Sequence, residues 1–180
     1  MTESSLLHAR LEQLKQSFDQ SFAEAPQAEP EPVESFLSIR VASHAYAVRL
    51  SETSGLYVDR KVVGLPSRAT ELLGMAGFRG TVIPVFDLAT CLGYVPSGEV
   101  GRWMLLVGKN EVIGLAFQEF DGHRRIAPHD LAHQEAGEAT RQHVRDVVVV
   151  EGMIRPVINL VAVIQALKRR VASVGSLEGA

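Results

Sequence analysis

The chain has 180 residues, of which 46% are hydrophobic, and a formal net charge of −3. This length fits one domain or two small subdomains that share a core, and this hydrophobic content excludes global disorder. The slightly acidic balance argues against binding to nucleic acid, and no apolar run reaches the roughly 18 residues of a membrane helix. The first residues do not resemble a secretory signal, and the single cysteine, Cys91, excludes an internal disulfide. We therefore expect a cytoplasmic protein.

Residues 1–23 are predicted to form an amphipathic helix. Large apolar residues recur at spacings of four, three, four and four, which places them on one helix face: Leu7, Leu11, Leu14, Phe18 and Phe22. Such a helix either packs on its own domain or binds a partner or a second copy of the chain, and two to three heptads do not decide between these. Residues 24–34 hold three prolines and four glutamates, which predicts an extended linker.

The segment from 36 to 158 has the alternating pattern of many short strands separated by turns. Strands are predicted at 36–41, 46–50, 55–59, 62–65, 74–78, 81–86, 102–107, 112–117, 120–126, 144–150 and 153–158. Helical segments are predicted at 87–93 and 160–170, residues 128–142 are expected to be irregular or weakly helical, and residues 171–180 are expected to form a flexible tail. This pattern is typical of β-barrels or sandwiches rather than of a parallel α/β sheet.

Two segments roughly seventy residues apart resemble each other. Residues 82–88 and 154–160 each carry Pro-Val in a strand, followed by an Asp or Asn that can cap a helix. The hairpins expected at 36–50 and 102–117 are also spaced alike. These similarities favour two similar β subdomains, with a break in the loop at 94–101. A proline inside each strand indicates a sheet edge or a bulge at that point.

The sequence lacks the motifs of common catalytic sites. It contains neither a phosphate-binding glycine loop nor the nucleophile elbow of hydrolases. Cys91 lies on an apolar helical face with Leu88 and Leu92, so we expect a small buried hydrophobe rather than a nucleophile. Asp87 is better explained as a helix cap than as a general acid. No cofactor is expected.

A histidine cluster provides an alternative interpretation. His129 and His133 would share one face of a helix and, with His143 downstream, could bind zinc in a metal-dependent enzyme. The cluster lacks the glutamate that follows the first histidine of the zincin motif, and Pro128 and Gly137 disfavour a long helix. Solvated loop histidines are therefore the competing interpretation.

Residues 73–88, LGMAGFRGTVIPVFDL, resemble the signature of the CheW-like domain family. That signature is a Gly, then Asn-Leu-Arg-Gly, then a strand that ends Pro-Val-x-Asp-Leu. Gly77 and Phe78 stand where the signature has Asn and Leu, and Gln118 replaces an acidic residue that is common in the family. Further similarities extend the resemblance over roughly 36–168; they lie at 36–48, 65–66, 72–74, 112–115 and 156–160.

The resemblance implies a mainly β fold of two SH3-like five-stranded β-barrel subdomains that share a core over residues 35–170. It implies no catalytic activity, no cofactor and no metal. Proteins of this family are adaptors that couple the cytoplasmic tips of chemoreceptors to the regulatory domain of a CheA-type histidine kinase, in chemotaxis or related motility signalling. A location at membrane-associated receptor arrays follows, without membrane insertion of the chain itself. Carried over by position, partner contacts are expected at Thr53, Gly55, Arg79, Gly80, Arg102 and Phe120.

Simpler structural roles stay open for some of these residues. Gly80 is also explained as a turn residue that supplies a positive φ, and Phe120 as a core residue. Arg79 has less structural reason to occupy a tight turn, so a binding role is favoured for it. The helix at 1–23 could add a third partner contact or drive self-association.

Overall fold

The computed structural model describes residues 33–96, 98–133 and 143–175, together with four residues near the N-terminus, Arg10, Glu12, Gln13 and Lys15. The chain divides into two compact units, Met1–Pro32 and Val33–Ala180. In the first unit the four described residues are helical and exposed. The rest of the predicted N-terminal helix and residues 24–32 of the predicted linker lie outside the described residues.

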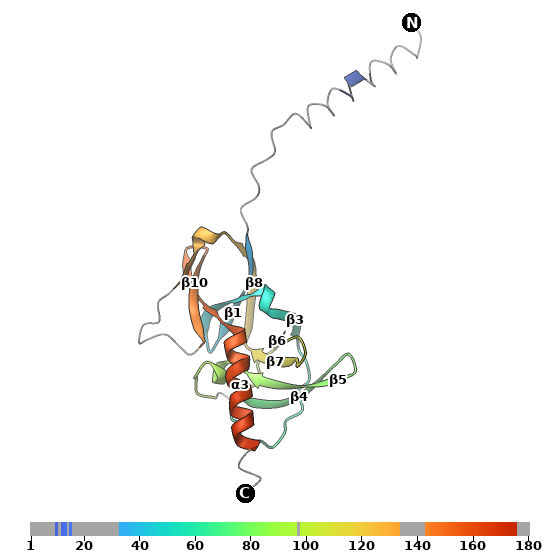
Figure 1. The fold of residues 1–180 in the computed structure, drawn as a ribbon, viewed down its shortest axis with the longest axis vertical. Coiled ribbons are helices and arrows are strands. Elements are labelled where there is room, and N and C mark those ends of the chain that lie inside the picture. The colour runs from blue at the N-terminus through green and yellow to red at the C-terminus, as the bar shows by residue number, and fades with distance from the viewer. Residues whose placement is uncertain are drawn as a thin grey trace. The chain divides into compact units, whose positions relative to one another are not determined.

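The described part of the second unit is mainly β, as predicted, and contains two sheets (Figure 1). Within the described residues, one sheet has six strands in the order β8-β1-β2-β11-β10-β9, and the other has five in the order β3-β6-β7-β5-β4. The strands of the six-stranded sheet are β1 Glu34–Val41, β2 His44–Arg49, β8 Glu119–Ile126, β9 Leu131–His133, β10 Val144–Val150 and β11 Met153–Ile158. Those of the five-stranded sheet are β3 Thr53–Val58, β4 Leu72–Phe78, β5 Thr81–Asp87, β6 Trp103–Val107 and β7 Ile113–Phe117.

The prediction of a strand at 62–65 was wrong, because only Val63 is paired there, in an isolated bridge to Met75.

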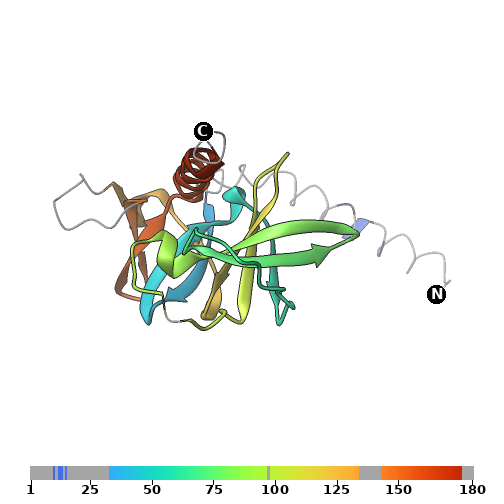
Figure 2. The same cartoon turned by 90° about the horizontal axis from the view of Figure 1, so that it is seen from below.

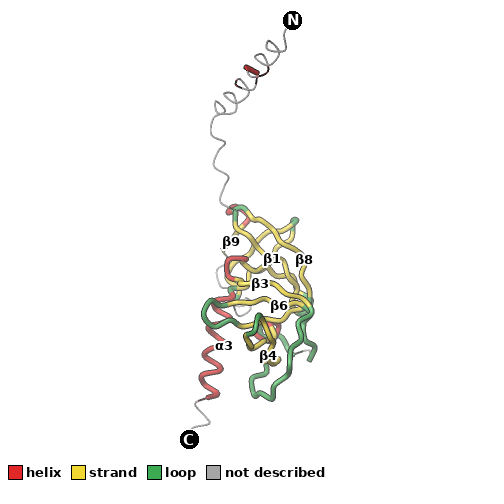
Figure 3. Tube along the Cα trace, turned by 90° about the vertical axis from the view of Figure 1, so that its right-hand side faces the viewer, coloured by secondary structure: helices red, strands yellow, loops and turns green. Residues whose placement is uncertain are grey.

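The helical segments are short except at the C-terminal end. They are the 3-10 turns Leu50–Glu52 and Pro128–Asp130, the helix α2 Leu88–Cys91 and the helix α3 Leu160–Gly175. The helix α3 continues past the end predicted at residue 170, and residues 176–180 of the predicted flexible tail lie outside the described residues. Figure 3 shows α3 alongside the sheets. Across the ranges that the structure describes, none of the helices is both long and apolar enough to span a bilayer.

Each sheet takes strands from both halves of the chain. The hairpin β1–β2 pairs with β8 on one side and, in parallel, with β11 on the other. The hairpin β6–β7 pairs in the same way with β3 and, in parallel, with β5. The similarity predicted between the two halves is therefore confirmed, but the halves exchange strands. The loop at 94–101 consequently connects two parts of one sheet and does not separate the two sheets.

The two strand prolines occupy equivalent positions, each where its strand has only one paired neighbour. Pro84 faces β4, and the parallel pairing of β5 with β7 begins only at the next residue, Val85. Pro156 faces β10, and the pairing of β11 with β2 begins only at Val157. A proline lacks the N–H that a second neighbouring strand would need, so each strand gains this neighbour only after its proline. Each proline therefore lies at a local edge of the pairing, although β5 and β11 are interior strands of their sheets.

Polar side chains cap both helices at their N-termini. The Asp87 carboxylate accepts hydrogen bonds from two backbone N–H groups of α2, at 3.3 and 3.1 Å. The Asn159 side chain accepts from the N–H of Ala162 at 2.8 Å. Both predicted caps are therefore confirmed. Glu52, from the 3-10 turn before β3, adds an acceptor for the N–H of Leu160 at 2.7 Å, which ties α3 to a distant part of the chain.

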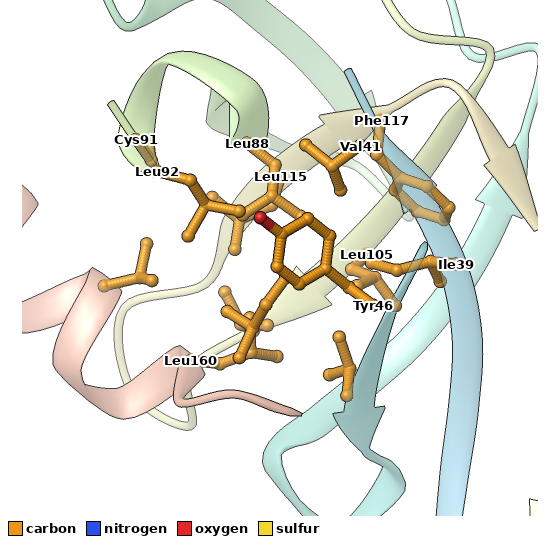
Figure 4. Close-up of a cluster of buried hydrophobic side chains, with 14 of the residues drawn as sticks. Ile39, Val41, Tyr46, Leu88, Cys91, Leu92, Leu105, Leu115, Phe117 and Leu160 are labelled. Atoms are coloured by element: carbon orange, nitrogen blue, oxygen red, sulfur yellow. The ribbon is translucent and has the colours of Figure 1, made fainter. Parts of the chain in front are cut away.

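The main hydrophobic core receives side chains from both sheets and from α2 and α3. Figure 4 labels ten of these residues: Ile39, Val41, Tyr46, Leu88, Cys91, Leu92, Leu105, Leu115, Phe117 and Leu160. Two smaller clusters lie apart from this core, one built by the five-stranded sheet around Phe78 and Met104 and one by the six-stranded sheet around Phe36 and Val148. Cys91 is buried, and its pKa is raised to about 12 by burial and by nearby Glu71 and Asp87. Its predicted role as a buried hydrophobe is confirmed.

Candidate partner-binding surface

Arg79 and Gly80 form the two-residue turn of the hairpin β4–β5, which projects from the rest of the five-stranded sheet (Figure 2). Their φ angles are 47° and 82°. Positive φ at both central positions suits the right-handed twist of a hairpin, and glycine or asparagine is the usual choice there. The turn role predicted for Gly80 is therefore confirmed. Arg79 is exposed, and its backbone occupies a region that non-glycine residues seldom adopt.

An aromatic pair lies next to this turn. Phe78, the residue before Arg79, is 8% exposed, and its ring contacts that of Tyr57 edge-on, with 4.9 Å between centroids. Because β3 and β4 are the two edge strands of the five-stranded sheet, this contact joins the two edges of the sheet. The guanidinium carbon of Arg60 lies 5.2 Å from the Tyr57 centroid and 5.3 Å from the Phe78 centroid. These distances are typical of cation–π contacts.

Arg102 is linked to this aromatic pair through Asp59, the residue before Arg60. Its guanidinium donates two hydrogen bonds to the Asp59 carboxylate, at 2.9 and 3.0 Å, and its backbone carbonyl accepts one from the N–H of Asp59. The hydrogen bonds from Arg102 lower the pKa of Asp59, and the same bonds raise the pKa of Arg102. Both side chains are more than half exposed, so the pair orients Arg102 at the surface and contributes little to stability.

Phe120 joins this region through Trp103. The two rings lie 5.2 Å apart between centroids, and both are half-buried against the main core. The ring of Phe120 therefore has a core contact, as its structural interpretation predicted. Because Phe120 is also partly exposed, the predicted contact with a partner stays a prediction.

The two β3 residues differ in position. A Cβ at Gly55 would lie 2.8 Å from the ring of Tyr57, so the glycine leaves room for that ring. Thr53 lies at the other end of β3, opposite Val107, and its hydroxyl donates to the carbonyl of Leu50 at 2.8 Å. Thr53 is thus separated from Arg102, which precedes the strand end opposite Val58.

Of the six predicted residues, the structure connects five through a few intermediaries. Gly55 lies against Tyr57, whose ring contacts Phe78, the residue before the Arg79-Gly80 turn. Arg102 is linked to this group through Asp59, and Phe120 is linked to it through Trp103. Sequence analysis missed these intermediaries: Tyr57, Asp59, Arg60 and Trp103. Their only signal was that these charged or aromatic residues lie in or directly after two predicted strands, at 55–59 and 102–107.

The predicted zinc cluster is not assembled. His129 lies in the 3-10 turn Pro128–Asp130 and His133 in β9, so the helix face that they were expected to share does not form. The pKa of His143 is lowered by burial and by the cations of Arg170 and Arg169. Among the residues that the structure describes, no group of three His, Cys, Asp or Glu side chains could hold a metal ion. The helix face on which the alternative zinc-site interpretation depended is therefore not present in the described residues.

Comparison with known proteins gives the family. The family model described as the CheW-like domain matches residues 35–168, which is nearly the whole second unit. The chain belongs to the CheW-like domain family. This confirms the resemblance found in the sequence.

Relatives of this CheW-like domain are distant. It is similar in fold to the crystal structure of scaffolding protein TtCheW from Thermoanaerobacter tengcongensis, with a TM-score of 0.63 and 16% identity over 71% of this chain and 89% of that chain. It is 25% identical over 81 residues to a probable chemotaxis protein CheW of Rhizobium etli. That match covers 44% of this chain and 52% of the relative, so the chain spans about half the length of this curated relative.

Proposed function

We propose that this CheW-like domain is a non-catalytic adaptor that couples the cytoplasmic tip of a chemoreceptor to the regulatory domain of a CheA-type histidine kinase. The observation that carries the proposal is the family match over residues 35–168, because it covers both sheets rather than one motif. The names of the relatives, a chemotaxis protein and a scaffolding protein, agree with this role. The adaptor would act in the cytoplasm, at membrane-associated receptor arrays, in chemotaxis or a related motility system.

In this proposal each sheet closes around its own small core as an SH3-like barrel. The contact between Tyr57 and Phe78 supports closure of the five-stranded sheet, since it joins the two edge strands. The kinase domain would bind the outer surface of one barrel. A helical receptor hairpin would bind near Arg102 and Phe120, where half-buried aromatic rings lie beside an exposed cation. Apolar anchors with a polar rim are the common composition of such interfaces.

Replacing Arg79 by Glu is expected to weaken binding to a receptor-tip fragment by about tenfold or more, because an exposed recognition cation becomes an anion. The fold should persist, since Glu151 already occupies the matching turn position of hairpin β10–β11 with a φ of 53°. Calorimetric titration of the receptor fragment and of the kinase regulatory domain measures the effect.

Arg125→Glu is the matched control for this charge change, because Arg125 is exposed on β8 of the other sheet. It should leave both affinities unchanged. Equal affinities for Arg79→Glu and wild type would remove Arg79 from the interface. Loss of the folded state would favour a structural role for Arg79.

Self-association through the N-terminal segment is a second proposal, favoured by the apolar stripe of residues 1–23. Sedimentation of the full chain should give a larger species than the chain that begins at Val33, which should be monomeric. Deletion to residue 32 rather than 34 keeps Glu34, which begins β1 and pairs with Arg49 at 2.9 Å. If both chains are monomeric, self-association is contradicted, and the N-terminal segment either packs on its own domain or binds another protein.

A further inference from the structure

Three cations near the β4–β5 turn have no carboxylate partner within the described part of the chain: Arg60, Lys61 and Arg79. All three side chains are exposed. Their neighbour Arg102 differs, since Asp59 neutralises it through two hydrogen bonds. These cations adjoin the contact between Tyr57 and Phe78, since Arg60 lies over both rings, Lys61 follows Arg60 and Arg79 follows Phe78.

Arg60 is also held in place, although it has no ion pair among the described residues. Its guanidinium lies over the rings of Tyr57 and Phe78 at nearly equal distances, 5.2 and 5.3 Å. The platform depends on Phe78, one of the two residues at which this chain departs from the family signature, because a leucine there would provide no ring. Restricting a long side chain before binding reduces the conformational entropy that a complex must lose.

We infer that Arg60, held on the rings of Tyr57 and Phe78, forms with Lys61 and Arg79 a cationic docking site for an acidic segment of a partner protein. The inference rests on the proposed adaptor function and gives its interface a charge preference. Guanidinium groups bind carboxylates through paired hydrogen bonds, which suits a glutamate- or aspartate-rich surface. Phe78 then determines partner choice, since it positions Arg60.

An acidic protein segment fits this site better than nucleic acid does. The rings of Tyr57 and Phe78 are engaged with each other and with Arg60, so they offer little free face for stacking with bases. Three cations on an acidic protein also give a much smaller positive footprint than nucleic-acid-binding domains carry.

The test is a fluorescence titration of the full chain with a short labelled glutamate-rich peptide, run at several salt concentrations. Arg60→Gln and Arg79→Gln should each weaken binding by about fivefold and reduce its salt dependence, because each removes one charge contact. Phe78→Leu should weaken binding as much as Arg60→Gln, and the double variant no more than either single one, because both changes remove the same contact. Arg125→Gln should bind as wild type.

Because Phe78 is largely buried, a second platform variant, Tyr57→Leu, is titrated in parallel, and circular dichroism establishes that each variant is folded. Wild-type peptide affinity in folded Phe78→Leu and Tyr57→Leu would overturn the role of the platform. An unaffected affinity in Arg60→Gln and Arg79→Gln, absence of peptide binding, or tighter binding of a labelled oligonucleotide would overturn the inference.

Parallel titrations of the receptor-tip fragment and the kinase regulatory domain separate this inference from the proposed function. If both proteins bind and Arg60→Gln changes neither affinity, the cationic site fails and the adaptor function stands. If the peptide binds through Arg60 and Arg79 while neither protein binds, the adaptor function fails and the cationic site stands.

Discussion

Asp121→Asn is expected to lower the free energy of unfolding by about 2–3 kcal/mol, because it leaves the buried guanidinium of Arg155 without its counter-charge. Arg155 is 4% exposed, and its Nη1 donates to the Asp121 carboxylate at 2.8 Å. The same carboxylate accepts from Nε of Arg40 at 3.1 Å. Asparagine keeps the shape of the side chain and removes the charge. Urea unfolding followed by circular dichroism measures the loss.

The internal similarity of the chain provides a compensating change. Alignment of residues 154–160 with 82–88 places Arg155 opposite Ile83, which is 4% exposed in the small core of the other sheet. Asp121→Asn combined with Arg155→Ile should therefore recover most of the lost stability, because Arg155→Ile removes the buried charge that Asp121→Asn leaves without a partner. A double variant as unstable as Asp121→Asn would contradict this explanation.

Acid should remove the contribution of Asp121 in wild type. Burial alone would raise the pKa of this carboxyl, but the hydrogen bonds from Arg155 and Arg40 outweigh burial and lower it. The pKa in the folded state is thus below that in the unfolded state, so the stabilisation is present above the unfolded pKa of about 3.9 and is lost as the pH falls through the folded pKa. Asp121→Asn should lose less stability than wild type over that acid range. As a control, Asp59→Asn, which breaks an exposed pair, should change the unfolding midpoint little.

Local features of this fold were accessible from the sequence because local chemistry determines them. Alternation gave most strands, Asp87 and Asn159 had the side chains of helix caps, and Pro84 and Pro156 could lie only where a strand lacks a second neighbour. The Arg79-Gly80 turn followed from the spacing of two strands around a glycine. The family signature supplied the arrangement in two sheets.

Features that depend on distant pairing were not accessible. Exchange of strands between the halves requires β3 to join β6, a choice that no local pattern of either strand expresses. The ion pairs of α3 were not accessible either. Lys168 pairs with Glu111 and Arg170 with Glu71, two contacts between distant residues that the pattern of the helix does not express.

The aromatic platform under Arg60 shows the same limit for the candidate site. Phe78 was recognised as a departure from the signature, but its meaning depends on a contact with Tyr57, twenty-one positions earlier, that exists only because two sheet edges meet. The sequence alone shows that Phe78 is unusual, but it does not show that Tyr57 and Arg60 contact it.

Gly74→Ala is expected to destabilise the domain by about 3 kcal/mol or more, through backbone strain and a clash that cannot relax locally. Gly74 has a φ of 145°, and a Cβ built on it would lie 2.1 Å from the carbonyl oxygen of Val63. That oxygen cannot simply move away, because it accepts from the N–H of Met75 at 2.9 Å, and the N–H of Val63 donates back to Met75 at 2.8 Å. Relief of the clash requires this bridge to open. Urea unfolding measures the cost.

The same change should impair the proposed docking site, since the bridge at Val63 fixes the segment that carries Arg60 and Lys61. Gly74→Ala is therefore expected to weaken binding of the glutamate-rich peptide at temperatures where the variant is still folded. Gly77→Ala is the matched control on the same strand, because a Cβ there meets nothing within 4 Å. It should change stability by less than about 0.5 kcal/mol and leave peptide binding intact. A folded Gly74→Ala protein with wild-type peptide affinity would show that Arg60 reaches its position without the bridge, from the two rings alone.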